Sequence, residues 1–262
     1  MTPLLDIRRL TMDFGGLRAL EAIDLAVHPA QTVALIGPNG AGKTTLFNCI
    51  TGIYRATAGD ARFQAGEGRC VPLRGLKPNQ VTALGICRTF QNIRLFGHMS
   101  ALENVLIGRH CRTRAGIAGA ILRSRRARDE ERRAAADSFR LLKKFGLAGH
   151  ADAPANSLPY GAQRRLEIAR AMATEPRLLL LDEPAAGMNP QETRELNRMI
   201  VQLREEEGVA ILLIEHDMRL VMSLAQHICV VDYGRKIAEG TPGQVRNNPA
   251  VIKAYLGEDD NA

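Results

Sequence analysis

The chain has 262 residues, of which 45% are hydrophobic and 4% aromatic, and its formal net charge is +7. This composition is typical of a globular protein with one large core, or with a core that carries a smaller subdomain. No apolar run approaches the roughly 18 residues of a membrane-spanning helix, which predicts a cytoplasmic chain with at most peripheral membrane association. The five cysteines lie outside C-x-x-C spacing and predict small buried side chains, not a zinc site or a disulfide framework.

Short apolar runs and helix caps predict the elements. Strands are expected at Leu4–Leu10, Ala22–Val27, Thr32–Ile36, Leu178–Leu181, Val209–Ile214 and Ile228–Asp232. Helices are expected from near Lys43, after the Ser100/Glu103 capping box, at Arg128–Phe145, Gly161–Thr174 and Pro190–Glu207, and after Asp217, Thr241 and Asn248. Only helices are predicted at about 92–160. The pattern predicts an α/β fold with a parallel sheet and an all-helical insertion.

The positive charge is concentrated in one segment. Residues 109–144 contain twelve Lys or Arg residues against four acidic ones, so this segment carries +8 and the rest of the chain −1. A general nucleic-acid surface usually draws on many segments, which this distribution does not. The excess is typical of a solvated helix of mixed charge, or of a surface for acidic lipid headgroups or an anionic protein.

The strongest motif is a glycine-rich loop between a predicted strand and a predicted helix. Gly37-Pro38-Asn39-Gly40-Ala41-Gly42-Lys43-Thr44-Thr45 matches the phosphate-binding pattern G-x-x-x-x-G-K-[ST]. Glycines in such a loop let backbone N–H groups surround a β-phosphate at a helix N-terminus. Lys43 is expected to neutralise β- and γ-phosphate oxygens, and the Thr44 hydroxyl to ligate Mg²⁺. The predicted contacts are Gly37, Asn39, Gly40, Ala41, Gly42, Lys43, Thr44 and Thr45.

Acidic and basic side chains follow two later strands. Asp182 and Glu183 come directly after the apolar run Leu178–Leu181, and His216 follows the run Val209–Ile214. Parallel strands present their carboxyl ends at one edge of a sheet, where α/β proteins bind ligands. Asp182 is therefore suited to Mg²⁺, and Glu183 to deprotonate an attacking water. His216 is predicted to reach a γ-phosphate, and Asp217 to cap the next helix.

These motifs, with what lies between them, resemble the nucleotide-binding subunits of ABC transporters. Leu158-Pro159-Tyr160-Gly161-Ala162 stands where that family has its signature motif, which opens a helix and faces the ATP of a partner subunit. Gln91 matches the glutamine loop that senses the γ-phosphate and contacts the membrane subunit. Phe14 stands where an aromatic ring stacks on adenine, and the segment 185–189 stands where the family has its dimer-spanning D-loop.

The resemblance implies a RecA-like P-loop core with a parallel sheet, added antiparallel strands and an inserted all-helical subdomain. The core is expected at residues 1–91 and 161–240, the helical subdomain at 92–160 with the basic insertion 109–144, and a C-terminal helical tail at 241–262. The cofactors are expected to be ATP and Mg²⁺. The implied catalytic residues are Glu183, His216 and Gln91, the metal ligands Thr44, Gln91 and Asp182, and the further ATP contacts Phe14, Tyr160 and Gly161.

A closer likeness is to the larger ATPase of branched-chain amino-acid importers. It rests on Arg88-Thr89-Phe90-Gln91, Arg94-Leu95-Phe96, Arg164–Arg170, Asp182–Gly187, Ile214–Met218 and the ending Asn247–Gly257. The implied partners are a second ATPase (or a second copy), two membrane-spanning permease subunits and, indirectly, a substrate-binding protein, with no specific nucleic acid. The chain is then expected peripherally at the cytoplasmic face of the inner membrane. Urea or amide importers, lipopolysaccharide export and a soluble non-transport ABC ATPase stay open as alternatives, and a nucleotide kinase is the rival from another class.

Two signature residues depart from the family pattern. Pro159 replaces the usual Ser and Ala162 the usual Gln, so a hydroxyl donor and a backbone N–H aimed at the partner's γ-phosphate are missing. ATP on this chain's own phosphate loop depends on the partner's signature. We therefore predict that the two composite sites of a heterodimer are unequal.

Overall fold

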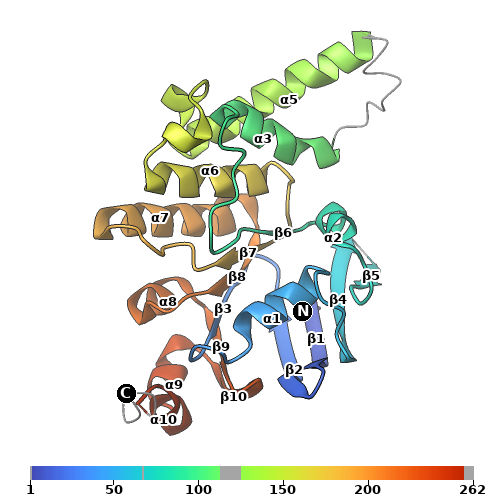
Figure 1. Cartoon of the computed structure of the whole chain (residues 1–262), viewed down its shortest axis with the longest axis vertical. Coiled ribbons are helices and arrows are strands. Elements are labelled where there is room, and N and C mark those ends of the chain that lie inside the picture. The colour runs from blue at the N-terminus through green and yellow to red at the C-terminus, as the bar shows by residue number, and fades with distance from the viewer. Residues whose placement is uncertain (1, 67, 113–124, 257–262) are drawn as a thin grey trace.

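The computed structural model describes residues 2–66, 68–112 and 125–256 (Figure 1). The strands are β1 (Leu5–Phe14), β2 (Leu17–Val27), β3 (Thr32–Ile36), β4 (Ala58–Gly66), β5 (Arg69–Pro72), β6 (Ile86–Arg88), β7 (Leu178–Asp182), β8 (Ala210–Ile214), β9 (His227–Asp232) and β10 (Arg235–Gly240). The helices are α1 (Lys43–Ile50), α2 (Pro78–Leu84), α3 (Ala101–Arg109), α5 (Arg125–Lys144), α6 (Tyr160–Met172), α7 (Pro190–Glu207), α8 (Met218–Leu224), α9 (Pro242–Arg246) and α10 (Pro249–Leu256). Short 3-10 helices lie at His110–Arg112, Ala148–His150 and Ala155–Ser157.

A six-stranded sheet forms the centre of the molecule. Its order is β10-β9-β3-β8-β7-β6, and all neighbours are parallel except β10, which pairs antiparallel with β9. Every residue of β3, β7 and β8 is buried. Such continuous apolar runs are typical of parallel strands that are covered on both faces. Because these neighbours are parallel, the strand order places the C-terminal ends of β6, β7 and β8 side by side.

Two cores lie on the two faces of this sheet. Leu178 and Leu180 of β7 belong to a core with α1 and the antiparallel sheet β2-β1-β4-β5. Leu179 and Leu181 alternate to the other face, where they pack with α6 and α7. The second core continues into α3 and α5, which extend beyond α6 at one end of the molecule (Figure 1).

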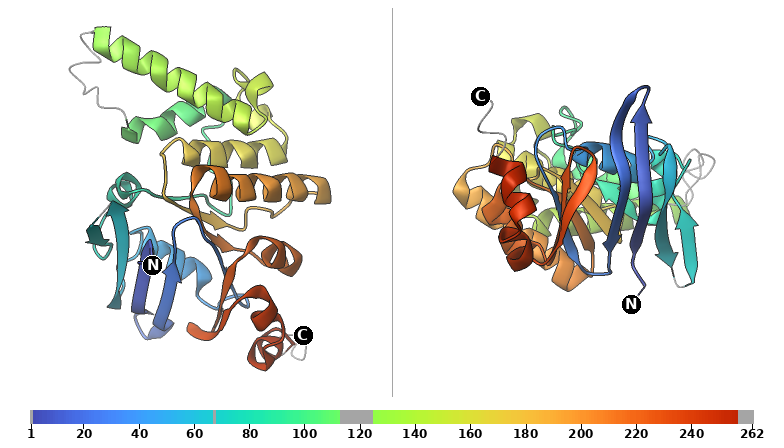
Figure 2. Two further views of the ribbon diagram at one scale, coloured as in Figure 1. Left: turned by 180° about the vertical axis from the view of Figure 1, so that it is seen from behind. Right: turned by 90° about the horizontal axis from the view of Figure 1, so that it is seen from below.

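The C-terminal helices lie at the end of the molecule opposite α3 and α5 (Figure 1). Helices α9 and α10 pack on α8 and on β9 through a small core that includes Val221, Val230, Val245 and Val251. Seen from below, they and the antiparallel sheet lie at opposite sides of the molecule (Figure 2). No helix of the described residues is long and apolar enough to cross a bilayer.

The α/β fold class, with its parallel sheet, added antiparallel strands and inserted helices, is confirmed. The prediction of five buried cysteines is confirmed for Cys49 and Cys229 and wrong for Cys70 and Cys111, which are exposed, while Cys87 is partly buried. Cys70 lies in the short strand β5, whose pattern of exposure shows no buried position. In the basic segment, residues 113–124 lie outside the described residues.

Candidate functional site

The phosphate-binding loop connects the end of β3 to the start of α1. Gly37 and Gly42 both have positive φ, 151° and 100°. A Cβ at Gly37 would lie 1.9 Å from the Val231 carbonyl oxygen, and one at Gly42 would lie 2.7 Å from that of Ala19. The path of the loop against its neighbours therefore requires glycine at both positions. The Lys43 ammonium is buried and donates to the carbonyls of Gly37 (2.6 Å) and Pro38 (2.7 Å).

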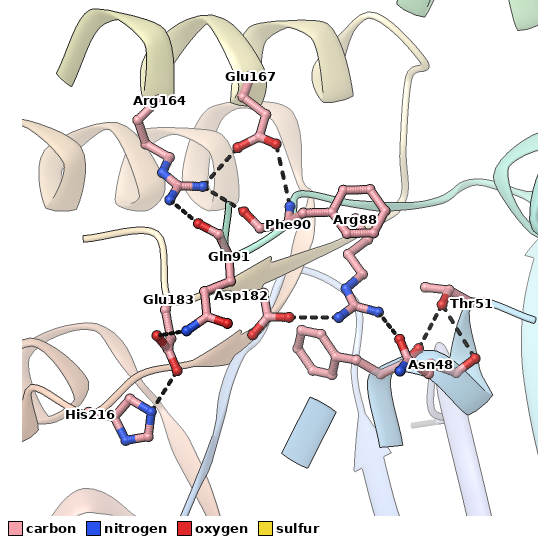
Figure 3. Close-up of polar contacts among 11 residues, drawn as sticks. Asn48, Thr51, Arg88, Phe90, Gln91, Arg164, Glu167, Asp182, Glu183 and His216 are labelled. Carbon is pink, nitrogen blue, oxygen red and sulfur yellow. Dashed lines mark hydrogen bonds and ion pairs between the residues drawn. The ribbon is translucent and has the colours of Figure 1, made fainter. Parts of the chain in front are cut away.

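Three side chains predicted to be catalytic meet at the edge formed by β6, β7 and β8. Gln91 Nε2 donates to Glu183 Oε2 at 2.7 Å, and His216 Nε2 lies 2.6 Å from Glu183 Oε1 (Figure 3). Each residue follows the end of a different strand, so the parallel order of the sheet brings them together. A carboxylate held between an amide and an imidazole is oriented to accept a proton from a bound water.

The backbone at Glu183 is in an unusual conformation. Its φ is +47°, in the left-handed region that a non-glycine residue seldom adopts. Its N–H donates to the Ile214 carbonyl at 2.9 Å. The chain therefore turns out of strand β7 immediately after Asp182, which leaves Glu183 at the sheet edge beside His216.

Asp182 has a buried partner that the sequence did not suggest. Arg88 Nη2 lies 2.6 Å from Asp182 Oδ2, and Arg88 Nη1 donates to Asn48 Oδ1 at 2.6 Å (Figure 3). The side chains of Arg88 and Asp182 are only 6% and 4% exposed. The guanidinium also lies 5.3 Å from the ring centres of Phe47 and Phe90. The sequence signal that could have pointed to this pair is the charge of Arg88 at the end of the short strand β6.

Glu215 is a second buried carboxylate beside the site. It accepts hydrogen bonds from the backbone N–H of Ala185 (3.0 Å) and of His216 (3.2 Å). Burial raises its pKa above the ordinary value, because desolvation disfavours the charged form. It joins the segment after β7 to the segment that carries His216. Asp217 caps α8 as predicted, accepting from the N–H groups of Arg219 and Leu220.

The donor set for a metal fits Mg²⁺. The predicted ligands are a hydroxyl (Thr44), an amide oxygen (Gln91) and a carboxylate (Asp182), all hard oxygen donors. Across the described residues, no three His, Cys, Asp or Glu side chains gather into a metal site of their own. Mg²⁺ in nucleotide sites is typically held by one or two carboxylates together with phosphates, so few protein ligands are needed.

The predicted signature residues lie at the start of α6, beside α7. The helix begins at Tyr160, and its N-cap Pro159 provides no side-chain hydrogen bond. A Cβ at Gly161 would lie 2.4 Å from Glu192 Oε1, and one at Gly187 would lie 3.3 Å from the Tyr160 ring. Tyr160 and Gly161 therefore contact the segment after β7 and helix α7. The phosphate loop lies elsewhere, at the start of α1.

The position predicted for adenine stacking carries an exposed aromatic ring that packs against a partly buried one. Phe14, at the end of β1, is 40% exposed, and its ring packs edge-on against Tyr54 at 5.2 Å between centroids. An exposed ring held by a second ring offers a flat apolar face for a planar base.

Sequence comparison places the chain among transport ATPases. The family model described as "ABC transporter" matches residues 20–186, and one described as "Branched-chain amino acid ATP-binding cassette transporter" matches residues 235–261. The high-affinity branched-chain amino acid transport ATP-binding protein BraF of Pseudomonas aeruginosa is 48% identical over 98% of both chains. LivG of Escherichia coli, with the same description, is also 48% identical over 98% of both chains.

A solved structure has the same fold over nearly the whole chain. It is an ATP-binding cassette of an ABC transporter in its ADP conformation, 28% identical, with a TM-score of 0.82. The match covers 98% of this chain and 100% of that one.

Proposed function

Because the chain belongs to the family of ABC transporter ATP-binding subunits, we propose that it is the ATP-hydrolysing subunit of an importer for branched-chain amino acids. The observation that carries this proposal is the 48% identity to BraF and LivG over 98% of the chain. The match of residues 235–261 to the branched-chain amino acid cassette family supports the same substrate class.

We assign the chemistry to the residues at the sheet edge. Lys43 and the N–H groups of the phosphate loop hold the β- and γ-phosphates, and Phe14 stacks on the base. Glu183 accepts a proton from the attacking water, while Gln91 and His216 orient its carboxylate, as their contacts of 2.7 and 2.6 Å support. Thr44, Gln91 and Asp182 would hold Mg²⁺, which supplies charge neutralisation to the phosphates when bound.

We base the proposed assembly on membership of the family. This chain pairs head-to-tail with a second ATPase, so that Tyr160 and Gly161 complete the partner's nucleotide site. The pair sits on two permease subunits at the cytoplasmic face of the inner membrane and powers uptake. Substrate is selected outside this chain, by the binding protein and the permeases.

Two variants of the purified chain test the assignment. Lys43→Ala should abolish tight ATP binding, because it removes the ammonium that neutralises the β- and γ-phosphates. Glu183→Gln should retain ATP binding while phosphate release falls about a hundredfold or more, because only the base is lost. Binding is measured by calorimetry. Unchanged affinity in K43A, or wild-type turnover in E183Q, would contradict these roles.

A test of the substrate class requires the whole transporter. We expect the chain, purified from its native source with its membrane subunits and supplied with its substrate-binding protein, to drive uptake of labelled leucine into proteoliposomes. Uptake of urea in place of leucine would assign the chain to the alternative importer class.

A further inference from the structure

The loop that carries Gln91 is tied to helix α6 by a buried ion pair. Arg164 is fully buried on the second turn of α6, and Glu167, one turn later, is 2% exposed. Arg164 Nη1 lies 2.8 Å from Glu167 Oε2 (Figure 3). A buried charge is tolerated only when it is paired and its hydrogen-bonding groups have partners.

The other partners of this pair are backbone atoms of the glutamine loop and the Tyr160 hydroxyl, which lies 3.4 Å from Arg164 Nη2. Arg164 donates from Nη1 to the Phe90 carbonyl and from Nη2 to the Gln91 carbonyl, both at 2.7 Å. Glu167 Oε1 accepts from the N–H groups of Phe90 and Arg94, both at 3.4 Å. The planar guanidinium thus holds two successive carbonyls and a carboxylate at once, which a lysine ammonium on a flexible stem cannot match in geometry.

Gln91 uses its main chain and its side chain for different neighbours. The Gln91 carbonyl is held by Arg164, while its side chain reaches Glu183. A displacement of α6 therefore displaces the amide that orients the Glu183 carboxylate. The same helix begins at Tyr160, where the partner's nucleotide is expected.

We propose that Arg164 and Glu167 form a clip that positions Gln91 against Glu183 and makes the glutamine loop and helix α6 move together. Arg164 is then a positioning residue for hydrolysis, acting through Gln91. The hydrolytic part of this inference rests on the proposed ATPase function. The mechanical part, that the clip holds the loop to the helix, does not.

Arg164→Lys tests the clip while it retains a charge for Glu167. ATP affinity should stay within twofold of wild type, because the phosphate loop is untouched, while phosphate release should fall about tenfold or more through misplacement of Gln91. Amide hydrogen exchange at residues 90–94 should speed up without nucleotide. The matched control is Arg165→Lys, since Arg165 lies on the same helix and pairs with Glu195 of α7 at 3.1 Å.

A double-mutant cycle separates positioning from a general structural defect. If Arg164 acts through Gln91, then adding R164K to Gln91→Ala should lower phosphate release by less than a further twofold. The proposal would be overturned if the double variant lost phosphate release by the product of the two single losses. It would also be overturned if R164K had wild-type turnover and wild-type amide exchange. Should R164K fail to fold, Arg164→Met/Glu167→Leu removes both charges and takes its place. Absence of ATPase activity from the wild-type chain assembled with its partner subunits would refute the proposed function, and the exchange experiment would still decide whether the clip exists.

Discussion

At the scale of single residues, the site depends on carboxylates whose surroundings differ. Asp182 is buried against Arg88, whereas Glu183 lies between an amide and an imidazole. The first is one of the three proposed Mg²⁺ ligands. The second is held by hydrogen-bonding groups on both sides, which orient the carboxylate for the proposed role of base.

The Arg88–Asp182 pair predicts a large effect on stability. Arg88→Met leaves the Asp182 carboxylate buried and unpaired, and we expect the free energy of unfolding to fall by about 3–5 kcal/mol. The matched control is Arg8→Met, because the Arg8–Asp6 pair is exposed, with Arg8 at 74%. Its effect should be below about 1 kcal/mol. Urea denaturation measures both, and similar losses in the two variants would contradict the structural role of the buried pair.

At the scale of elements, helix α6 is unusual at its start. Most helix N-termini are capped by a Ser, Thr, Asp or Asn side chain, as α7 is by Asn189, which accepts from the N–H groups of Gln191 and Glu192. Helix α6 has Pro159 there, with φ −56° and ψ 151°. These angles suit an N-cap serine, so the backbone could accept one without rearrangement.

We therefore predict that Pro159→Ser raises the rate of ATP hydrolysis. In the proposed assembly, a hydroxyl and an N–H are returned near the partner's γ-phosphate, and one such bond to a charged group is worth about 1.5–3 kcal/mol. If it is formed mainly in the transition state, phosphate release by the isolated chain at saturating ATP should rise about tenfold or more. Pro159→Ala, which returns only the N–H, is the control. Unchanged or lower activity in a folded serine variant would show that Tyr160 and Gly161 already suffice.

The elements that the sequence revealed are those with a strong local pattern. Continuous apolar runs identified β3, β7 and β8, the Ser100/Glu103 capping box identified the start of α3, and the pair Thr241-Pro242 identified the start of α9. The sequence of β4 is small and polar, with only Ala61 and Phe63 buried, and it becomes a strand through its pairing with β1. Such pairing depends on residues more than 40 positions away and leaves no local signal.

The site divides in the same way. Lys43, Asp182 and Glu183 lie in motifs with fixed spacing, so their placement could be predicted. Arg88 could not, because its partner Asp182 lies 94 positions away. Arg164 and Glu167, three residues apart, read as an ordinary surface pair on a helix, and their backbone partners in the glutamine loop have no sequence signature.

At the scale of the whole molecule, part of the basic segment is neutralised within the chain. Arg109 pairs with Asp137 and Glu175, and Lys144 with Glu206 and Glu207 at the end of α7. The outer part of α5 keeps exposed arginines. The positive surface of the described residues is therefore narrower than the charge count suggested.

We expect this surface to contact anionic lipid. Replacing Arg128, Arg132 and Arg133 with Gln should weaken binding to phosphatidylserine vesicles by roughly 1 kcal/mol per charge, measured by co-sedimentation, without altering ATP affinity. A control with the same change in net charge replaces Arg9, Arg69 and Arg74, which are exposed in the antiparallel sheet region. Equal losses in both triple variants would show that only net charge matters.

The left-handed backbone at Glu183 lowers the stability of the fold at a residue that the proposed hydrolysis requires. A non-glycine residue in this region carries strain of about 1–2 kcal/mol, which glycine does not. Selection of this chain for heat resistance alone should therefore enrich Glu183→Gly, whose melting temperature should rise by about 2–4 °C while phosphate release is lost. A lower melting temperature in that variant would show that the Gln91 and His216 contacts outweigh the strain. If the melting temperature rises, directed evolution for thermostability has to retain turnover as a second criterion, because otherwise it discards the proposed base.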